Sequence, residues 1–485
     1  MTIAGTLSSA LSGLTANARA AEIVASNIAN AMTEGYGRRE IVTISRQVGA
    51  IGQGVEVVGV YRHADQALIG DRRVAESTAG HHRSRSEFLQ RLERALGTPG
   101  EEQSLNGRIA AFDTALIEAS SRPESEARLS RLADTARALT GHLAEVSGEI
   151  QSARSLADDA IAADVRRLNS ALTRVGEINS LIRANSGSGR DSSALMDQRQ
   201  QVIDSISAIV PVREVLRDNG QVALVTAQGA TLVDGAVSQI GFAPAGRITP
   251  AMTRDSGALS GLTLNGKPIA VSGDGSPIAG GSLAGHFMVR DDLAPAAQAQ
   301  VDAVARELVE RFSAPGLDPT RAPGAPGLFT DAGAAFDPAS EAGLSQRLRL
   351  NAAVDPDEGG ALWRLRDGLG ATEPGAAGDA RLLHDWQSAL TGLQTPASAS
   401  FMAGERSLAS LAADLLSGIA ADRLTAEGEA SYAEARAQSL RGMELTGGVD
   451  SDQEVQTLLL IEQNYAANAK VVKAVDEMLQ LLLGI

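Results

Sequence analysis

Cysteine is absent from the 485 residues, and aromatic side chains make up only 3% of them. Without cysteine the chain has no disulfide, no thiolate nucleophile and no thiolate metal site. Two Trp, four Tyr and eight Phe are too few to build several aromatic cores, so Ala, Leu, Val and Ile must supply most of the packing. Such a composition favours long helices packed side by side.

Basic residues are also scarce. Lys and Arg total 43 against 59 acidic residues, which leaves a net charge of −16. This negative field excludes a general nucleic-acid binder. No run approaches the ~18 consecutive apolar residues of a membrane-spanning helix, and the first cation is Arg19, so no basic segment opens the chain. We therefore expect no membrane insertion and no cleavable secretory signal peptide.

The N-terminal residues carry a heptad pattern. From about residue 3 to residue 32, apolar residues alternate at spacings of four and three, which predicts one helix of about 30 residues. Gly35 is expected to end it. The helix has little apolar area and would be marginal alone in water, so it needs partners on more than one side. Its seam consists of Leu7, Leu11, Leu14, Ala18, Ala21, Ala25, Ile28 and Met32.

A second heptad seam of similar length lies at the C-terminus. It predicts a helix from about Asp452 to Leu483, with acidic residues at its positive N-terminal end. Asn468 is the one polar member, and a single polar seam residue sets the register between helices. We expect the two terminal helices to pair. The seam consists of Leu458, Ile461, Tyr465, Asn468, Val472, Val475, Leu479 and Leu482.

Between the ends, the hydrophobic period changes twice. Helical spacing covers 105–116, 129–182, 293–312 and 398–445. Short β-prone runs occupy 211–290 and are separated by Asn-Gly and Asp-Gly pairs, which are strong hairpin signals. The run from Pro315 to Pro326 is rich in Pro and Gly and is predicted to be an exposed loop.

These patterns predict a mainly α fold with a β insert. We expect an elongated multi-domain protein with paired terminal coiled-coil helices, a long helical bundle and a small antiparallel β domain in the middle of the chain. The predicted divisions are an N-terminal coiled-coil segment (1–45), the first part of a helical rod domain (46–205), a β-rich insert (206–290), a returning helical domain with the Pro/Gly-rich loop (291–440), and a C-terminal coiled-coil segment (441–485).

No constellation of residues points to catalysis. The six histidines form no His-Glu-x-x-His arrangement, and His81 and His82 are adjacent, so they point apart on a helix. No phosphate-binding Gly-Lys-Ser/Thr motif occurs. Acidic pairs such as Asp158-Asp159 and Asp291-Asp292 carry no weight among 59 acids. We expect no catalytic residue, no cofactor and no metal.

Both ends resemble a known family. The stretch from Ala25 to Tyr36, ASNIANAMTEGY, resembles the N-terminal signature of the bacterial flagellar axial proteins, the rod, hook and hook-associated families, although Glu34 replaces their usual proline. Residues 463–472, QNYAANAKVV, resemble the matching C-terminal signature. Three further segments resemble the hook-associated proteins, namely 35–39, 195–201 and 282–291.

The resemblance implies a structural, non-enzymatic protein that assembles at the hook tip and joins the hook to the filament. The implied partners are further copies of the chain in a ring or tube, the hook protein, a second hook-associated junction protein, and an export chaperone at the C-terminal helix. The implied location is extracellular, in the flagellum, after export without a cleavable signal peptide.

Eighteen positions form the predicted assembly interface. They are the seam residues other than Met32 and three residues of the N-terminal signature: Leu7, Leu11, Leu14, Ala18, Ala21, Ala25, Ile28, Asn30, Gly35, Tyr36, Leu458, Ile461, Tyr465, Asn468, Val472, Val475, Leu479 and Leu482. Two alternatives stay open at this point. One is another axial protein, a hook or distal rod subunit. The more distant one is a secreted enzyme that uses the β insert.

Overall fold

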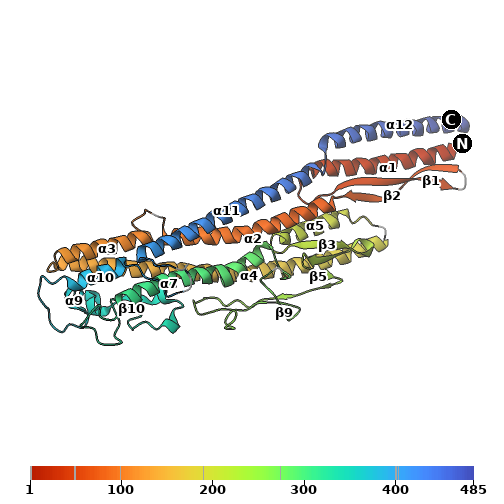
Figure 1. Cartoon of the computed structure of the whole chain (residues 1–485). Helices are drawn as coiled ribbons and strands as arrows, with labels where there is room; N and C mark the ends of the chain where they lie inside the picture. Colours follow the sequence, from red (N-terminus) through yellow and green to blue (C-terminus); the bar gives the residue numbers. More distant parts are fainter. Residues whose placement is uncertain are drawn as a thin grey trace.

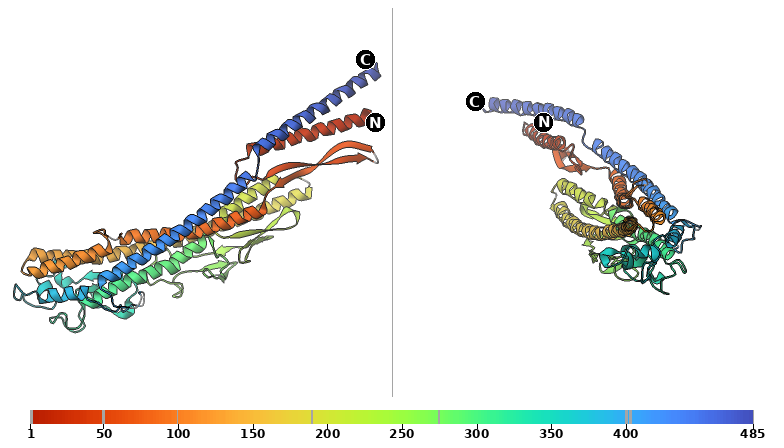
Figure 2. Two further views of the ribbon diagram at one scale, coloured as in Figure 1. Left: turned by 45° about the horizontal axis from the view of Figure 1, so that its top comes forward. Right: turned by 90° about the vertical axis from the view of Figure 1, so that its left-hand side faces the viewer.

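The chain folds into an elongated, mainly helical molecule (Figure 1). The computed structural model describes residues 3–48, 51–98, 100–188, 190–273, 275–398, 401 and 404–484. Both chain ends lie at one extremity, and the middle of the chain extends to the other (Figure 2). The predicted fold class, mainly α with small antiparallel sheets in the middle of the chain, is confirmed.

Helices supply most of the length. The described helices are α1 (Ile3–Ala29), α2 (Gln66–Leu96), α3 (Leu105–Ser121), α4 (Glu126–Ser188), α5 (Ser193–Ser207), α6 (Gly281–Met288), α7 (Ala294–Phe312), α8 (Leu344–Arg347), α9 (Arg364–Asp367), α10 (Arg381–Thr391), α11 (Leu408–Thr446) and α12 (Ser451–Leu483). A π-helical turn, η2 (Val289–Leu293), joins α6 to α7. In the described part of the chain, no helix has both the length and the apolarity that a membrane crossing requires.

The strands form small antiparallel sheets. A hairpin joins β1 (Arg38–Val48) to β2 (Ile51–His63), and β10 (Phe329–Asp331) pairs with β11 (Leu348–Leu350). The order β3-β4-β5-β6 unites strands Val212–Leu216, Val222–Thr226, Thr231–Asp234 and Ala236–Val237. The order β7-β8-β9 unites Ile240–Gly241, Leu262–Leu264 and Lys267–Ile269. Asn265 and Gly266 have φ angles of 51° and 78°, as a tight hairpin turn between β8 and β9 requires.

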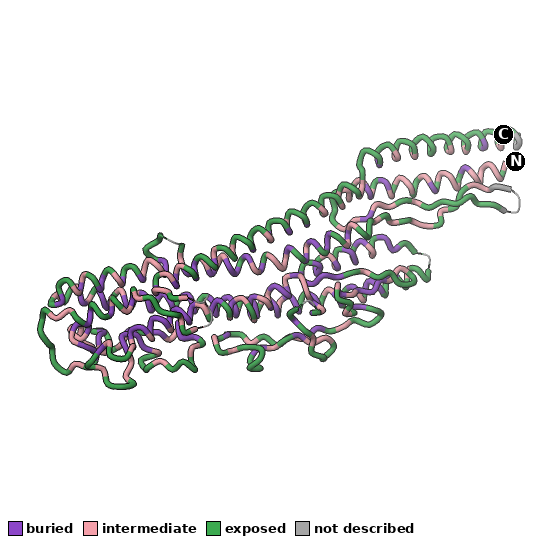
Figure 3. Tube along the Cα trace, viewed as in Figure 1, coloured by how far each residue is buried: buried purple, intermediate pink, exposed green. Residues whose placement is uncertain are grey.

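Two parts of the molecule can be distinguished by their packing. We call α1, the hairpin β1–β2 and α12 the terminal module, and we call residues 66–446 the body. Within the body, α11 runs along α2, and α4 packs against α3, α5 and α7. Figure 3 shows that buried residues gather in the body, whereas α12 is largely exposed.

The hairpin β1–β2 was not predicted from the sequence. The predicted helical rod domain begins at residue 46, but residues 51–63 form strand β2 instead. One more expectation needs correction: the strands of the insert end at Ile269, and Gly281 opens α6. Most of 313–380 is irregular. The run Pro315–Pro326 is mostly exposed, as expected. The division into domains stays a prediction.

A buried arginine ties the π-helical turn η2 to α4. Arg290 and Asp158 are both 0% exposed, and the Nη1 of Arg290 lies 2.7 Å from the Oδ1 of Asp158. Asp291 holds the other side of the guanidinium at 2.8 and 3.0 Å. The guanidinium also lies 4.8 Å from the ring centre of Phe287. Asp158 and Asp291, each a member of an adjacent acidic pair, therefore have a structural role.

Three histidines of the body make the folded chain less stable at low pH. Burial lowers the pKa of His81, His142 and His286 below the ordinary value of about 6.5, and for His286 this outweighs the attraction of Asp164. As the pH falls below about 6.5, these imidazoles bind protons in the unfolded chain but not yet in the folded chain. The free energy of unfolding therefore falls with the pH.

We therefore expect the urea midpoint of unfolding to decrease between pH 7.5 and pH 5.5. A His142→Gln chain should lose less stability over this interval than the parent chain, because one depressed imidazole has been removed. Parallel urea curves at both pH values measure the difference. Equal losses in the two chains would contradict the assignment.

Candidate assembly site at the terminal module

The helices α1 and α12 pair in antiparallel orientation. Leu7 lies in a groove with Val472, Val475 and Leu479 near the end of α12. Near the other end of the pair, the Nδ2 of Asn27 donates to the Oε2 of Glu454 at 3.0 Å. The residue numbers in contact therefore rise on one helix as they fall on the other, and both helices run side by side over most of their length.

The C-terminal seam faces α1. Val475 is 1% exposed, and Leu458, Ile461, Asn468, Val472 and Leu479 are half-buried. Tyr465 remains 48% exposed, and the side chain of Leu482 lies outside the described residues. The predicted heptad thus marks the covered face of α12, apart from Tyr465.

Asn468 occupies a central place in the pair, opposite Gly13. A Cβ on Gly13 would come within 2.8 Å of the Nδ2 of Asn468, so the glycine lets the two helices approach closely here. The amide of Asn468 donates to the carbonyl of Asn464, one turn earlier on its own helix. Its proposed effect on the register between the two helices stays a prediction.

The N-terminal seam divides between two environments. Leu7, Leu14, Ala21 and Ile28 are half-buried, whereas the alternate members Leu11, Ala18, Ala25 and Met32 are exposed, Leu11 by 59%. Sequence reasoning missed the buried residues of α1, which are Ala10, Ala16, Val24 and Asn27. Because α1 packs against the hairpin as well as α12, its covered face is rotated away from the heptad seam.

Apolar side chains of the terminal module remain uncovered in the single chain. On α12 all of them except Tyr465 lie away from the seam, and on α1 they include the exposed seam members. The exposed large residues of α12 are Val455, Leu459, Leu460, Tyr465, Val471, Met478 and Leu481. Such an accumulation on one element marks a surface for contact with other molecules.

Asn27 joins all parts of the terminal module and is fully buried. Its Nδ2 donates to the backbone carbonyl of Arg39 at 2.9 Å and to Glu454. Its Oδ1 accepts from the Tyr36 hydroxyl at 2.9 Å and from the Arg39 backbone N–H at 3.0 Å. The buried Glu454 also pairs with Arg38 at 2.6 Å. The N-terminal signature therefore holds the helix, the hairpin and α12 together through one amide.

The other signature residues lie around this cluster. Tyr36 is half-buried, and the guanidinium carbon of Arg39 lies 4.9 Å from the centre of its ring. Gly35 has a φ of 78°, which a residue with a side chain rarely adopts. Asn30 makes local contacts, with its Nδ2 donating to the Ser26 carbonyl at 2.9 Å and its Oδ1 accepting from Thr33.

We expect Asn27→Ala to loosen the terminal module and leave the body intact. The substitution removes four hydrogen bonds from a dry site, and each buried polar group left without a partner costs about 1–3 kcal/mol. Amide hydrogen exchange in β1, β2 and α12 should accelerate by at least about tenfold, the factor for ~1.4 kcal/mol. Asn30→Ala, a control with only local contacts, should change exchange little. Equal acceleration in the body would contradict this expectation.

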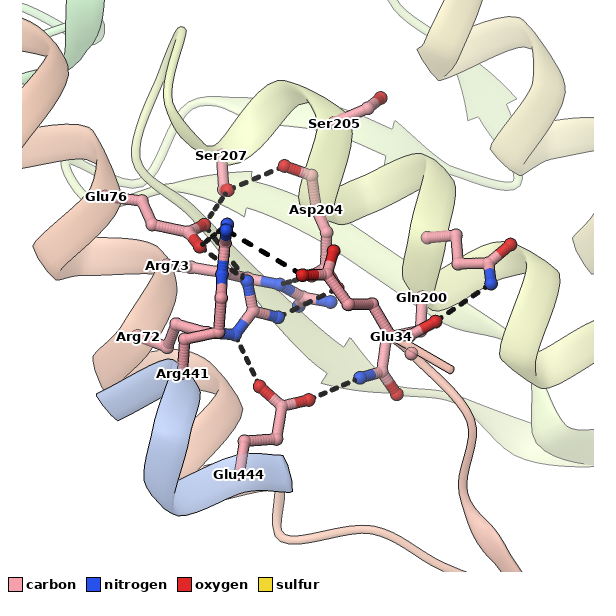
Figure 4. A network of polar contacts seen from close by, with 12 residues as sticks. Glu34, Arg72, Arg73, Glu76, Gln200, Asp204, Ser205, Ser207, Arg441 and Glu444 are labelled. Atoms are coloured by element: carbon pink, nitrogen blue, oxygen red, sulfur yellow. Dashed lines mark hydrogen bonds and ion pairs between the residues drawn. The ribbon is translucent and has the colours of Figure 1, made fainter. Parts of the chain in front are cut away.

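Charged side chains also concentrate where the body meets the terminal module (Figure 4). Arg72 of α2 is buried and contacts Glu76 at 2.9 Å, Asp204 of α5 at 2.8 Å and Glu444 of α11. Burial alone would lower the pKa of Arg72, but the three carboxylates outweigh it and raise the pKa. Burial likewise opposes the charged form of Glu76, yet Arg72 and the Ser207 hydroxyl keep its pKa low. The contacts of Arg72 therefore hold α2, α5 and α11 together.

Among the described residues, no group of three His, Cys, Asp or Glu could hold a metal ion. A cavity of about 320 Å³ adjoins the charged cluster. Arginine and carboxylate side chains both line it, and they pair with one another. The polar groups of this region serve packing between elements.

Family models match the chain in three places. The "Flagella basal body rod protein" model matches residues 7–36, and the "Flagellar basal body rod FlgEFG protein C-terminal" model matches residues 442–485. Between them, the "Flagellar hook-associated protein FlgK helical domain" matches residues 89–326. The chain belongs to the flagellar axial proteins. In this axial protein, the two rod-type matches contain most of α1 and all of α12, the two helices that pair with each other.

Individual relatives agree with these matches. The axial protein is 28% identical over 237 residues to flagellar hook-associated protein 1 of Salmonella typhimurium, covering 47% of this chain and 42% of the relative. It is 26% identical over 242 residues to the protein of that name from Escherichia coli, covering 48% and 44%. It is 25% identical over 240 residues to the protein of that name from Bacillus subtilis, covering 47% of this chain and 47% of the relative. The chain is thus aligned with less than half of each relative's length.

A solved structure is also similar. It is the flagellar hook junction protein FlgK from Burkholderia pseudomallei, with 17% sequence identity and a TM-score of 0.44. The aligned part covers 54% of this chain and 46% of that chain.

Proposed function

We propose that this chain is a structural subunit of the bacterial flagellum that assembles at the tip of the hook and joins the hook to the filament. The observation that carries the proposal is the match of residues 89–326 to the helical domain of a hook-associated protein. Rod and hook subunits share the terminal signatures, but this middle region distinguishes the hook-associated proteins from them. A hook or distal rod subunit is therefore the less favoured assignment.

The role is mechanical and not catalytic. The polar groups around Asn27 and Arg72 are mostly paired with one another, and both clusters lie between packed elements. The uncovered apolar surfaces of α1 and α12 are the ones that other subunits would cover on assembly. Leu11, Ala18 and Ala25 are accordingly proposed as contacts between subunits, and Leu7, Val475 and Leu479 as contacts within one subunit.

The proposed partners follow from the position of the chain between hook and filament. They are further copies in a ring or tube, the hook protein and a second hook-associated protein. Before assembly, the exposed leucines of α12 would be a liability in water, and an export chaperone at this helix would cover them. The proposed location is extracellular, at the hook–filament junction, after export by the flagellar secretion apparatus without a cleavable signal peptide.

A deletion strain tests the proposal directly. We expect electron micrographs of cells without the gene to show complete hooks that lack filaments, with filament subunits released into the medium. A plasmid copy of the gene should restore filaments and swimming. Cells without hooks would instead favour the rod or hook subunit, and cells with normal filaments would contradict an axial role at the junction.

A further inference from the structure

The terminal module shares no hydrophobic core with the body in the described part of the chain. Two apolar clusters fill the body, and their members all lie between Phe88 and Ala426. None belongs to α1, β1, β2 or α12. The buried apolar residues of the module, such as Val24 and Val475, lie on the paired helices themselves. Contacts of another kind must therefore determine how the module is placed on the body.

The chain connections between the two parts are short and leave free space. Residues 64–65 connect β2 to α2, and residues 447–450, which include Gly447 and Gly448, connect α11 to α12. Cavities of about 320 Å³ and 480 Å³ adjoin this second connection, and Gly448 lines both. This free space leaves room for a change of angle at Gly447 and Gly448.

Polar contacts with one turn of α5 occupy the joint instead. The Oδ1 of Asp197 accepts from the Gly37 backbone N–H at 2.9 Å and from the Nε of Arg62 at 2.7 Å. Its Oδ2 accepts from the Nη2 of Arg39 at 2.6 Å. Three separate groups of the hairpin and its approach thus converge on one carboxylate of the body, whose side chain is only 10% exposed.

Two glutamines on the same face of α5 extend this contact. The Oε1 of Gln200 accepts from the Nη2 of Arg62 at 2.6 Å, while its Nε2 donates to Glu444 of α11 at 2.9 Å. The Nε2 of Gln201 donates to the Glu34 carbonyl at 2.9 Å. Positions 197, 200 and 201 are neighbours on a helix surface because they are three and four residues apart. The two sequence segments singled out separately, 35–39 and 195–201, are therefore two sides of one joint.

We propose that the Asp197 turn of α5 is the docking surface that sets the direction of the terminal module relative to the body. Asp197 is the positioning residue, because its carboxylate neutralises Arg39 and Arg62 and binds the backbone at Gly37. Partly buried charges are screened by salt much less than exposed ones, so the joint holds at physiological ionic strength. When the carboxylate is removed, the module swings about its two connections and the body stays folded. This proposal does not depend on where in the flagellum the chain acts.

The absence of native cysteine makes a distance measurement clean. Nitroxide labels on Glu22→Cys of α1 and Thr78→Cys of α2, both at exposed positions, report the angle between module and body by double electron–electron resonance. We expect one narrow distance distribution in the labelled parent chain. Asp197→Ala should broaden it at least twofold, and the main thermal transition should stay within a few degrees of the parent value.

A matched control has an acid with similar contacts inside the body. Asp331 accepts two hydrogen bonds from Arg347, at 2.7 and 3.0 Å, and its side chain is 13% exposed. Asp331→Ala should leave the distance distribution narrow. Arg62→Ala changes the same joint from the side of the module, so it tests the proposal even if Asp197→Ala affects folding of α5. A broad distribution in the parent chain, or narrow ones in both joint variants, would overturn the proposal.

Discussion

A chain that ends at residue 477 should fold its body normally and fail to attach filaments. Removal of residues 478–485 deletes Leu479, which is half-buried against α1, together with the remaining turns of α12. A fully buried aliphatic side chain contributes about 1.5–3 kcal/mol, so the two seam leucines of this segment would forfeit about 3–6 kcal/mol of packing in the assembled state. That loss is large beside ordinary association energies.

The truncation should not affect the folding of the body. Both of its apolar clusters lie outside α12, so we expect a soluble monomer with the main calorimetric transition unchanged. Filament attachment and swimming should not return when this chain is supplied to a deletion strain. The double variant Leu479→Ala/Leu482→Ala keeps the helix at full length and should behave in the same way. Restored swimming would show that the end of α12 is dispensable, and loss of the main transition would show that it belongs to the core of the monomer.

Asp158→Ala should destabilise the body by about 3 kcal/mol or more. Removal of one partner of a buried ion pair leaves an uncompensated charge, which typically costs about 3–5 kcal/mol. Arg290 would retain Asp291 and the Ser260 carbonyl, which places the expected cost near the lower limit. The backbone N–H of Ala245, which donates to Asp158 at 2.7 Å, would also lose its partner.

The adjacent residue is the matched control for this variant. Asp159 is exposed on the same turn of α4, so Asp159→Ala should change the free energy of unfolding by less than about 0.5 kcal/mol. Urea unfolding of the two variants and the parent chain measures the contrast. Equal effects at positions 158 and 159 would show that helix propensity or net charge, and not the ion pair, governs stability here.

The C-terminal seam could be predicted from spacing alone, but only half of the N-terminal seam could. Among the described residues the α12 helix packs mainly on α1, so a single heptad stripe defines most of its covered face. The α1 helix is covered by α12 and by the hairpin, and the hairpin lies over a different arc of its surface. Small residues such as Ala10 and Ala16 are buried on α1, and hydrophobic periodicity gives them no special weight.

The hairpin itself left a signal in the sequence. Residues 41–44 are Ile-Val-Thr-Ile, and Val55, Val57, Val58 and Val60 follow within 20 residues. Such β-branched runs favour strands. The strong helical periods on both sides of this segment mask the signal.

The sequence by itself determined the helices, the hairpin turns of the insert, the absence of thiol chemistry and the likeness to the axial proteins. Each of these depends on composition or on residues within a few turns of one another, where local spacing carries the information. Only the tertiary structure decided that Asp197 meets Arg39, 158 residues away, and that Asp158 meets Arg290, 132 residues away. Charged pairs so distant in the chain follow no period, and the folding of the helices around them alone decides which opposite charges meet.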